Sequence, residues 1–196
     1  MTSRVALEEL RSASICDAAL RLLSSKGFAG IRVQDIADEA GVSKGTIYLY
    51  FKSLEEILEK TFETVVEGLF VRLRRELAAA TSFPEGIEIV ARAHMEYFGE
   101  RQDFFRVFLS MAEPLGEKRL RGSRSYGRYV TQLLPLLEAA QSRGELRLTD
   151  TSRTAIAITA VLRDLVLQRV GEDSPRPLEE DVAFAREMIC GGMARA

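Results

Sequence analysis

VQDIADEAGVSKGTIYLYF, residues 33–51, predicts two short helices joined by a tight turn. Val33, Ile36, Ala37 and Ala40 recur at helical spacing and give the first helix one apolar face. Gly41 then ends that helix, because glycine readily takes the left-handed conformation at a helix C-terminus. The remainder of the chain is interpreted outward from this pair of helices.

Ser43 is the N-cap candidate for the second helix, Lys44 to Tyr50. Ile47 and Phe51, four residues apart, point inward, while Leu49 points the opposite way. A helix this short is not stable alone, so a scaffold must hold it while its far face contacts something. A helix-turn-helix whose second helix enters a DNA major groove fits this description. An ordinary αα-hairpin is the alternative.

The outward side of the second helix favours DNA. Lys44 and Lys52 bracket it, and no Asp or Glu lies between Gly41 and Leu54. Gly45 permits close backbone approach, and the hydroxyls of one threonine and two tyrosines suit phosphate oxygens. We therefore predict that the DNA-binding residues are Arg32, Gln34, Lys44, Gly45, Thr46, Tyr48, Leu49, Tyr50 and Lys52.

The run from Ile15 to Leu58 resembles the TetR/AcrR family of bacterial transcriptional regulators. The resemblance is carried by DAALRLLSSKGFAG, QDIADEAGVSKGTIYLYF and KSLEEIL, and it covers about a quarter of the chain. Ile31 and Arg32 stand where the family commonly has Thr or Ser, and Leu54 stands where a basic residue is common. These departures bear on DNA affinity, since they remove a side-chain cap and a phosphate contact, and leave the fold as expected.

Composition excludes several other classes of protein. The 196 residues carry 27 basic and 29 acidic side chains, net −2, so any affinity for DNA must be local to one surface. With a single histidine, His94, and two distant cysteines, no metal cluster or histidine-based nucleophile can be assembled, and we predict no cofactor and no enzyme. The absence of an apolar leader or span predicts a cytoplasmic protein.

The periodic pattern predicts an all-α fold of about nine helices. Residues 1–53 form the helix-turn-helix domain and residues 54–196 the effector-binding and dimerisation domain. We expect helices over 12–26, 53–80, 85–99, 103–112, 117–143 and 152–170, and a last one carrying Leu178 to Ile189. Pro135 should kink the fifth of these, because proline removes one backbone hydrogen bond.

An effector pocket is implied by the resemblance in the aromatic stretch from Tyr97 to Met111. Plain core packing is the alternative for so many large apolar side chains. The predicted ligand-binding residues are Tyr97, Phe98, Phe105, Phe108 and Met111. Five basic residues follow without an acid between them, at positions 118, 119, 121, 124 and 128; this Lys118–Arg128 cluster is a solvated face or attracts an anion.

The helix over 152–170 is apolar on nearly every side between Ala155 and Leu167, so more than one partner must cover it. The resemblance implies a homodimer through the last two helices, and the predicted interface residues are Ile158, Leu162, Leu165, Val166, Val182 and Ile189. The resemblance implies a homodimeric repressor that a small, mainly apolar effector releases from a palindromic DNA operator. An activator of the same fold, or a helical adaptor that binds protein, remains open.

Overall fold

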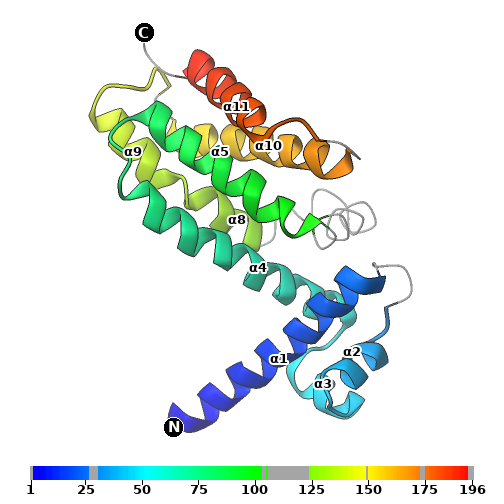
Figure 1. Cartoon of the computed structure of the whole chain (residues 1–196). Coiled ribbons are helices and arrows are strands. Elements are labelled where there is room, and N and C mark those ends of the chain that lie inside the picture. Colours follow the sequence, from blue (N-terminus) through cyan, green and yellow to red (C-terminus); the bar gives the residue numbers. More distant parts are fainter. Residues whose placement is uncertain are drawn as a thin grey trace. The chain divides into compact units, whose positions relative to one another are not determined.

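A computed structural model describes residues 2–26, 31–102, 105, 124–148, 150–172 and 175–193. Within these ranges the regular elements are helices, with one isolated bridge at Leu146, which confirms the all-α fold class (Figure 1). They form two compact units, residues 2–65 with Phe105 and residues 66–102 with 124–193. The boundary falls inside the long helix α4 (Leu54–Leu77), beyond the domain limit at residue 53 that the sequence suggested.

The first unit contains α1 (Thr2–Lys26), α2 (Val33–Glu39), α3 (Lys44–Tyr50) and the start of α4. α1 contacts both short helices, and α2 contacts α3 (Figure 1). Each helix contributes apolar side chains to one small core, which includes Ile15, Ala19, Leu22, Ile36, Ile47, Phe51 and Leu58. The sequence prediction of α2 and α3 is confirmed, α3 to the residue.

The predicted start of α1 at Ser12 is wrong, because the helix begins at Thr2. The prediction followed the apolar face that starts at Ile15. The first turns carry good helix formers, and their two leucines, Leu7 and Leu10, are both exposed. Helix propensity alone, with no periodic apolar face, therefore extends this helix.

The second unit contains the rest of α4 with α5 (Phe83–Gly99), α8 (Arg124–Thr131), α9 (Leu134–Ser142), α10 (Thr151–Gly171) and α11 (Leu178–Met193). α5 lies in its middle, against α9, α10 and α11 (Figure 1). Its buried residues include Phe83, Ile87, Val90, Met95 and Phe98. Ser82 caps α5, since its Oγ accepts a hydrogen bond from the Glu85 amide, and Pro84 occupies the first turn, where its missing N–H costs nothing.

The kink predicted at Pro135 is a complete break, because α8 ends at Thr131 and α9 begins at Leu134. Proline cannot donate to the carbonyl of Thr131, four residues earlier, so the helix cannot continue through this point. The remainder of the predicted helix, residues 117–123, lies outside the described residues, as does the predicted helix 103–112 apart from Phe105.

Ion pairs join α11 to its neighbours in the second unit. Arg92 on α5 donates through both Nη atoms to the carboxylate of Glu179, at 2.5 and 2.7 Å. Arg169 on α10 donates to Asp181 at 2.7 Å, and both side chains of that pair are largely buried. In the described part of the chain, no helix is both long and apolar enough to cross a bilayer.

Candidate DNA-reading surface and ligand pocket

The turn before α3 has the geometry that the sequence predicts. Gly41 has φ 66°, in the left-handed region, and the amide of Val42 donates to the carbonyl of Ala37 at 2.9 Å. Ser43 caps α3, because its Oγ accepts a hydrogen bond from the Thr46 amide at 3.1 Å. The buried Ile47 and Phe51 anchor the helix, so its opposite side faces away from the core.

The outward side of α3 exposes a large apolar and a large aromatic side chain to solvent. The Leu49 side chain is 80% exposed and Tyr48 is 50% exposed, although nothing in the first unit requires an apolar side chain at that point. A β-carbon on Gly45 would meet only the Oγ of Ser43, at 3.7 Å. Packing within the chain therefore does not explain the glycine, which lowers helix stability relative to alanine.

The polar groups around α3 carry positive charge without a nearby free acid. Lys44 and Lys52 are exposed, and Lys44 Nζ lies 6.0 Å from the centre of the Tyr48 ring. Two acids that flank α3 in the sequence have partners: Glu39 accepts from Arg21 at 2.7 Å, and Glu56 accepts from the Lys52 amide at 2.6 Å. The surface can therefore receive an anion such as a phosphate.

Two of the predicted DNA-binding residues, Gln34 and Arg32, form hydrogen bonds with acids of α2. Gln34 donates from Nε2 to Asp38 Oδ1 at 2.7 Å, so its amide must release that partner before it can bond a base in two-point fashion. The Arg32 amide donates to Asp35 at 2.8 Å, which caps α2 from the carboxylate three residues on and leaves the exposed Arg32 guanidinium outside the cap. Both assignments to DNA stay predictions.

The predicted effector residues that the structure describes belong to two different units. Phe98 is buried in the second unit, whereas Phe105 is buried in the first. Tyr97 is half-buried, and burial raises the pKa of its phenol. The guanidinium of Arg101 lies 3.9 Å from the centre of the Tyr97 ring. Phe108 and Met111 lie outside the described residues, so the predicted effector site stays a prediction.

Of the Lys118–Arg128 cluster, the structure describes the side chain of Arg128 alone. It donates a hydrogen bond to Glu67 on α4, which also accepts from Arg74 at 3.0 Å. This arginine is therefore paired with an acid on a neighbouring helix. The rest of the cluster lies outside the side chains described.

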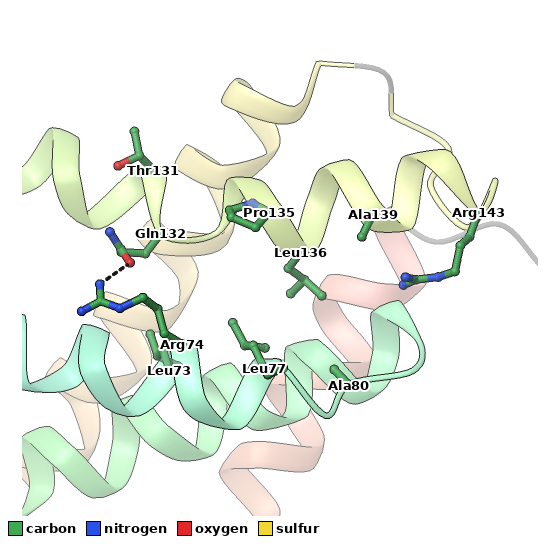
Figure 2. Close-up of a pocket in the computed structure, with 11 residues that line it drawn as sticks. Leu73, Arg74, Leu77, Ala80, Thr131, Gln132, Pro135, Leu136, Ala139 and Arg143 are labelled. Atoms are coloured by element: carbon green, nitrogen blue, oxygen red, sulfur yellow. Dashed lines mark hydrogen bonds between the residues drawn. The ribbon is translucent and has the colours of Figure 1, made fainter.

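A pocket of about 360 Å³ lies between the end of α4 and the α8–α9 break (Figure 2). Its walls are mostly apolar, and its polar groups stand at the ends: Arg74 with Gln132 at one, Arg143 at the other. Of the predicted effector residues that the structure describes, Tyr97, Phe98 and Phe105, none lines it. The lining residues discussed below are Leu73, Leu77, Ala80, Pro135, Leu136 and Ala139.

A second pocket, of about 400 Å³, lies beside the C-terminal end of α5 and the α10–α11 loop. Its charged side chains already have partners, because Glu96 bonds Arg72 and Arg169 bonds Asp181. Tyr97 and Phe98 do not line this pocket either, although their neighbours Met95, Glu96 and Gly99 do.

Most of the predicted dimer residues are buried within one copy of the chain. Leu165 is partly exposed, whereas five of the six have at most 2% of their surface exposed: Ile158, Leu162, Val166, Val182 and Ile189. The apolar side chains that α10 and α11 leave exposed are Ile156, Phe184 and Met188. A partner that packs on the outer side of α10 and α11 would therefore contact Ile156, Phe184 and Met188.

Comparison with known proteins finds relatives of the first unit. Residues 15–61 match the model of bacterial regulatory proteins of the tetR family. A fatty acid metabolism regulator protein of Bacillus subtilis is 34% identical over 80 residues, 41% of each chain. The transcriptional regulator BetI of Burkholderia thailandensis is 31% identical over 81 residues, 41% of this chain and 42% of its own. The matches span about two fifths of these curated relatives.

The similarity in fold extends over nearly the whole chain. The fatty acid degradation regulator FadR from Bacillus halodurans superposes with a TM-score of 0.73 over 92% of this chain and 98% of its own, at 24% identity. The TetR family regulator PfmR from Thermus thermophilus superposes with a TM-score of 0.65 over 90% of this chain and 97% of its own, at 27% identity. The proteins compared here are named as regulators of transcription or metabolism and not as enzymes.

Proposed function

We propose that this chain, which belongs to the TetR family of bacterial regulatory proteins, is a homodimeric DNA-binding transcriptional repressor that a small, mainly apolar effector releases. The observation that carries the proposal is the outer side of α3. It combines an 80%-exposed leucine, a glycine that packing does not require and two lysines, with no acid from Gly41 to Leu54. A surface of this kind is unfavourable in water and suits a major groove.

In the proposed complex α3 lies in the major groove. Leu49 faces base edges, Gly45 lets the helix backbone approach the DNA, and Lys44, Tyr50 and Lys52 hold phosphates on either side. Phosphate contacts set the register of the helix, whereas contacts to base edges select the sequence. The hydroxyl of Thr46 lies 2.8 Å from Ser43 Oγ, so it can reach a phosphate only as part of that pair.

The proposed dimer forms through the outer sides of α10 and α11. Ile156, Phe184 and Met188 are 45%, 53% and 46% exposed, and aromatic and methionine side chains are enriched in protein interfaces. These residues replace the buried positions proposed from the sequence as the contacting set. Two reading helices so joined would meet half-sites about one DNA turn, roughly 34 Å, apart.

The effector is proposed to act by population shift. A ligand that binds the second unit better in one arrangement than in another changes the fraction of dimers whose reading helices match the operator. Linkage requires that operator DNA weaken effector binding by the same factor. Tyr97 and Phe98 on α5 remain the proposed contacts, with Phe105, Phe108 and Met111.

The test is selection of duplexes from a random-sequence DNA library with the full chain, followed by measurement of affinity against salt. We expect enriched sites with two inverted half-sites, and an affinity that falls steeply as salt rises. Gly45→Glu should abolish binding while the protein stays folded, because residue 45 has open space around it. An adaptor would select no sequence and would bind DNA equally poorly with either residue, and that result would overturn the proposal.

A further inference from the structure

We propose that the pocket between α4 and the α8–α9 break is a binding site for an elongated apolar molecule that ends in a single carboxylate. The site belongs to the second unit alone and does not depend on DNA binding. The described effector residues proposed above, Tyr97, Phe98 and Phe105, do not line it.

The pocket is a trough between two stretches of helix. One wall is Leu73 and Leu77 on α4, with Ala80 just after the helix; opposite lie Thr131 at the end of α8 and Pro135 and Ala139 on α9 (Figure 2). Residues 73–80 line it on one side and residues 131–139 on the other, so the pocket is elongated (Figure 2). This shape and the apolar walls suit a chain-like molecule better than a compact polar one.

One end of the trough is closed by a bond between the two helices. Arg74 Nη1 on α4 donates to Gln132 Oε1 at 3.2 Å, across the position where α8 ends (Figure 2). The second Nη atom of Arg74 is bonded to Glu67 at 3.0 Å. Arg74 thereby holds that end of the trough together.

The other end carries the group that would recognise a carboxylate. Arg143 lines the trough, and Figure 2 shows its guanidinium turned toward the apolar walls. Its Nε and Nη2 donate to Glu145 at 2.5 and 3.2 Å. A guanidinium has five N–H donors, so these two bonds leave three for a ligand.

Glu145 fixes the direction of this arginine. Its Oε2 also accepts from the Phe83 amide at 2.6 Å, at the start of α5. The hydrogen bond from Arg143 lowers the pKa of Glu145, so that carboxyl stays charged at neutral pH and holds the guanidinium in place. Arg143 is therefore oriented before a ligand arrives, which lowers the entropy cost of binding.

The depth of the trough depends on Gly86. A β-carbon on Gly86 of α5 would lie 2.4 Å from Leu136 Cδ1, so the bare backbone of α5 lets Leu136 sit back from the trough. Leu136 is 8% exposed and forms part of the wall. Gly86 is thus a positioning residue for the pocket, because any side chain there pushes Leu136 toward Leu77.

The volume limits the size of the ligand. One water-sized group occupies roughly 30 Å³, so the 360 Å³ trough holds about a dozen non-hydrogen atoms. Decanoate has that number. We therefore choose straight-chain carboxylates around this length as probes, with 1-decanol as the uncharged equivalent.

The experiment is calorimetric titration of the full chain with hexanoate, octanoate, decanoate and tetradecanoate. Each added methylene should raise the affinity about fourfold until the trough is full, from the free energy of burying one CH₂. Tetradecanoate should gain nothing further over decanoate. Absence of binding, or an affinity independent of chain length, would overturn the proposal.

Two matched pairs of variants place the binding in this trough. Ala139→Phe fills it from an exposed position and should weaken decanoate at least tenfold, whereas Ala79→Phe, exposed but outside the lining, should leave it unchanged. Arg143→Gln should weaken decanoate about tenfold and leave 1-decanol unchanged, whereas Arg147→Gln should affect neither. If Ala139→Phe binds decanoate like the wild type, the site is elsewhere and the proposal fails.

Gly86→Ala supplies a third, independent change. It should weaken decanoate without adding any atom to the trough itself, because Leu136 moves inward. Thermal unfolding checks that each variant is folded before it is titrated. A folded Gly86→Ala variant with wild-type affinity would contradict the role assigned to Leu136.

Discussion

The phenolic oxygen of Tyr97 on α5 lies against the backbone of α4 at Gly68, where a β-carbon would be 2.2 Å from it. Tyr97 is held in this place from its other side, because Arg101 stacks on the ring and donates to the Tyr97 carbonyl at 3.1 Å. Close by, Arg72 on α4 bonds Glu96 on α5. The two helices are therefore joined at this level by contacts that leave no room for a side chain at residue 68.

Gly68→Ala should destabilise the protein by about 1–3 kcal/mol, because the added methyl forces Tyr97 or the backbone to move. Gly127→Ala is the matched control. Residue 127 also lies within a helix but has nothing within 4 Å, so alanine there should stabilise by about 0.5–1 kcal/mol. Urea unfolding of the two variants should shift in opposite directions, and shifts of the same sign would refute the close contact.

His94 should make stability depend on pH. It is buried, its Nδ1 donates to the Val90 carbonyl at 2.7 Å, and burial lowers its pKa from 6.5 to about 4. Between these values the unfolded chain binds a proton that the folded chain does not, so stability falls as the pH drops from 6.5 to 4. The loss for a shift of this size is about 3 kcal/mol.

Urea unfolding at pH 7.5 and 5 measures the part of this loss that falls above pH 5, about 2 kcal/mol, and a variant isolates it. His94→Gln keeps a side-chain donor for Val90 but has no titrating ring, so its stability should vary less between the two pH values than that of the wild type. His94 is the sole histidine in the chain, which leaves only carboxylates to titrate in common. Equal pH dependence in both proteins would mean that His94 is protonated without penalty.

Phe184→Glu should convert the proposed dimer to a monomer without unfolding it. The side chain is 53% exposed in one copy, so a charge costs little there until a partner covers it. Val71→Glu, on α4 at 58% exposure, is the control and should leave the dimer intact. Light scattering at micromolar concentration decides between them; a wild type that is already monomeric would contradict the dimer.

The local features of the first unit are predictable because they depend on neighbouring residues. Gly41 and Ser43 determine the turn and the cap through bonds within a few residues, and Pro135 ends a helix by its own chemistry. The long N-terminal part of α1 was missed because Leu7 and Leu10 face solvent and give no periodic core signal.

The outer side of α10 could not be identified from the sequence, because a helix that is apolar all round has no distinguishable face. Its buried residues, such as Leu162 and Val166, are chemically equivalent to the exposed Ile156 until the neighbouring helices are placed. The trough in Figure 2 was missed for a similar reason: Leu77 and Ala139 lie far apart in the chain, and neither residue type signals a pocket.

Gly45→Ala should raise stability and lower operator affinity at once. Alanine removes the conformational cost of glycine within α3, worth about 0.5–1 kcal/mol, and its methyl enters open space in the free protein. On DNA the same methyl keeps the helix backbone away from the groove. Thermal unfolding and operator titration should therefore change in opposite senses, and unchanged affinity would show that α3 does not approach DNA at residue 45.

Lys52→Ala should weaken binding to all DNA sequences alike, because a lysine beside a phosphate recognises charge and not bases. The slope of log affinity against log salt should fall by about one unit per lysine removed. Affinities measured on the selected operator and on an unrelated duplex at several salt concentrations check both statements. A loss confined to the operator would assign Lys52 to base contact.

Leu49→Ala should weaken operator binding by about 1 kcal/mol and relax the preference at one thymine in each half-site. Leu49 is 80% exposed at the point of α3 opposite Ile47 and Phe51, and a leucine has no hydrogen bond to offer guanine or adenine. The apolar feature of the major groove is the C5-methyl of thymine, so this is the group that Leu49 can contact. The alternative is that Leu49 packs only on the neighbouring Tyr48 and Tyr50.

Replacement of that thymine by uracil, which lacks only the methyl, separates the two interpretations. If Leu49 contacts the methyl, the wild type should bind the uracil operator more weakly than the thymine operator. Leu49→Ala should bind both operators equally, because it lacks the side chain that contacts the methyl. The two changes form a double-mutant cycle whose coupling energy belongs to the leucine–methyl contact. Wild-type affinity that is unchanged by uracil at every thymine of the half-site would show that Leu49 reads none of them.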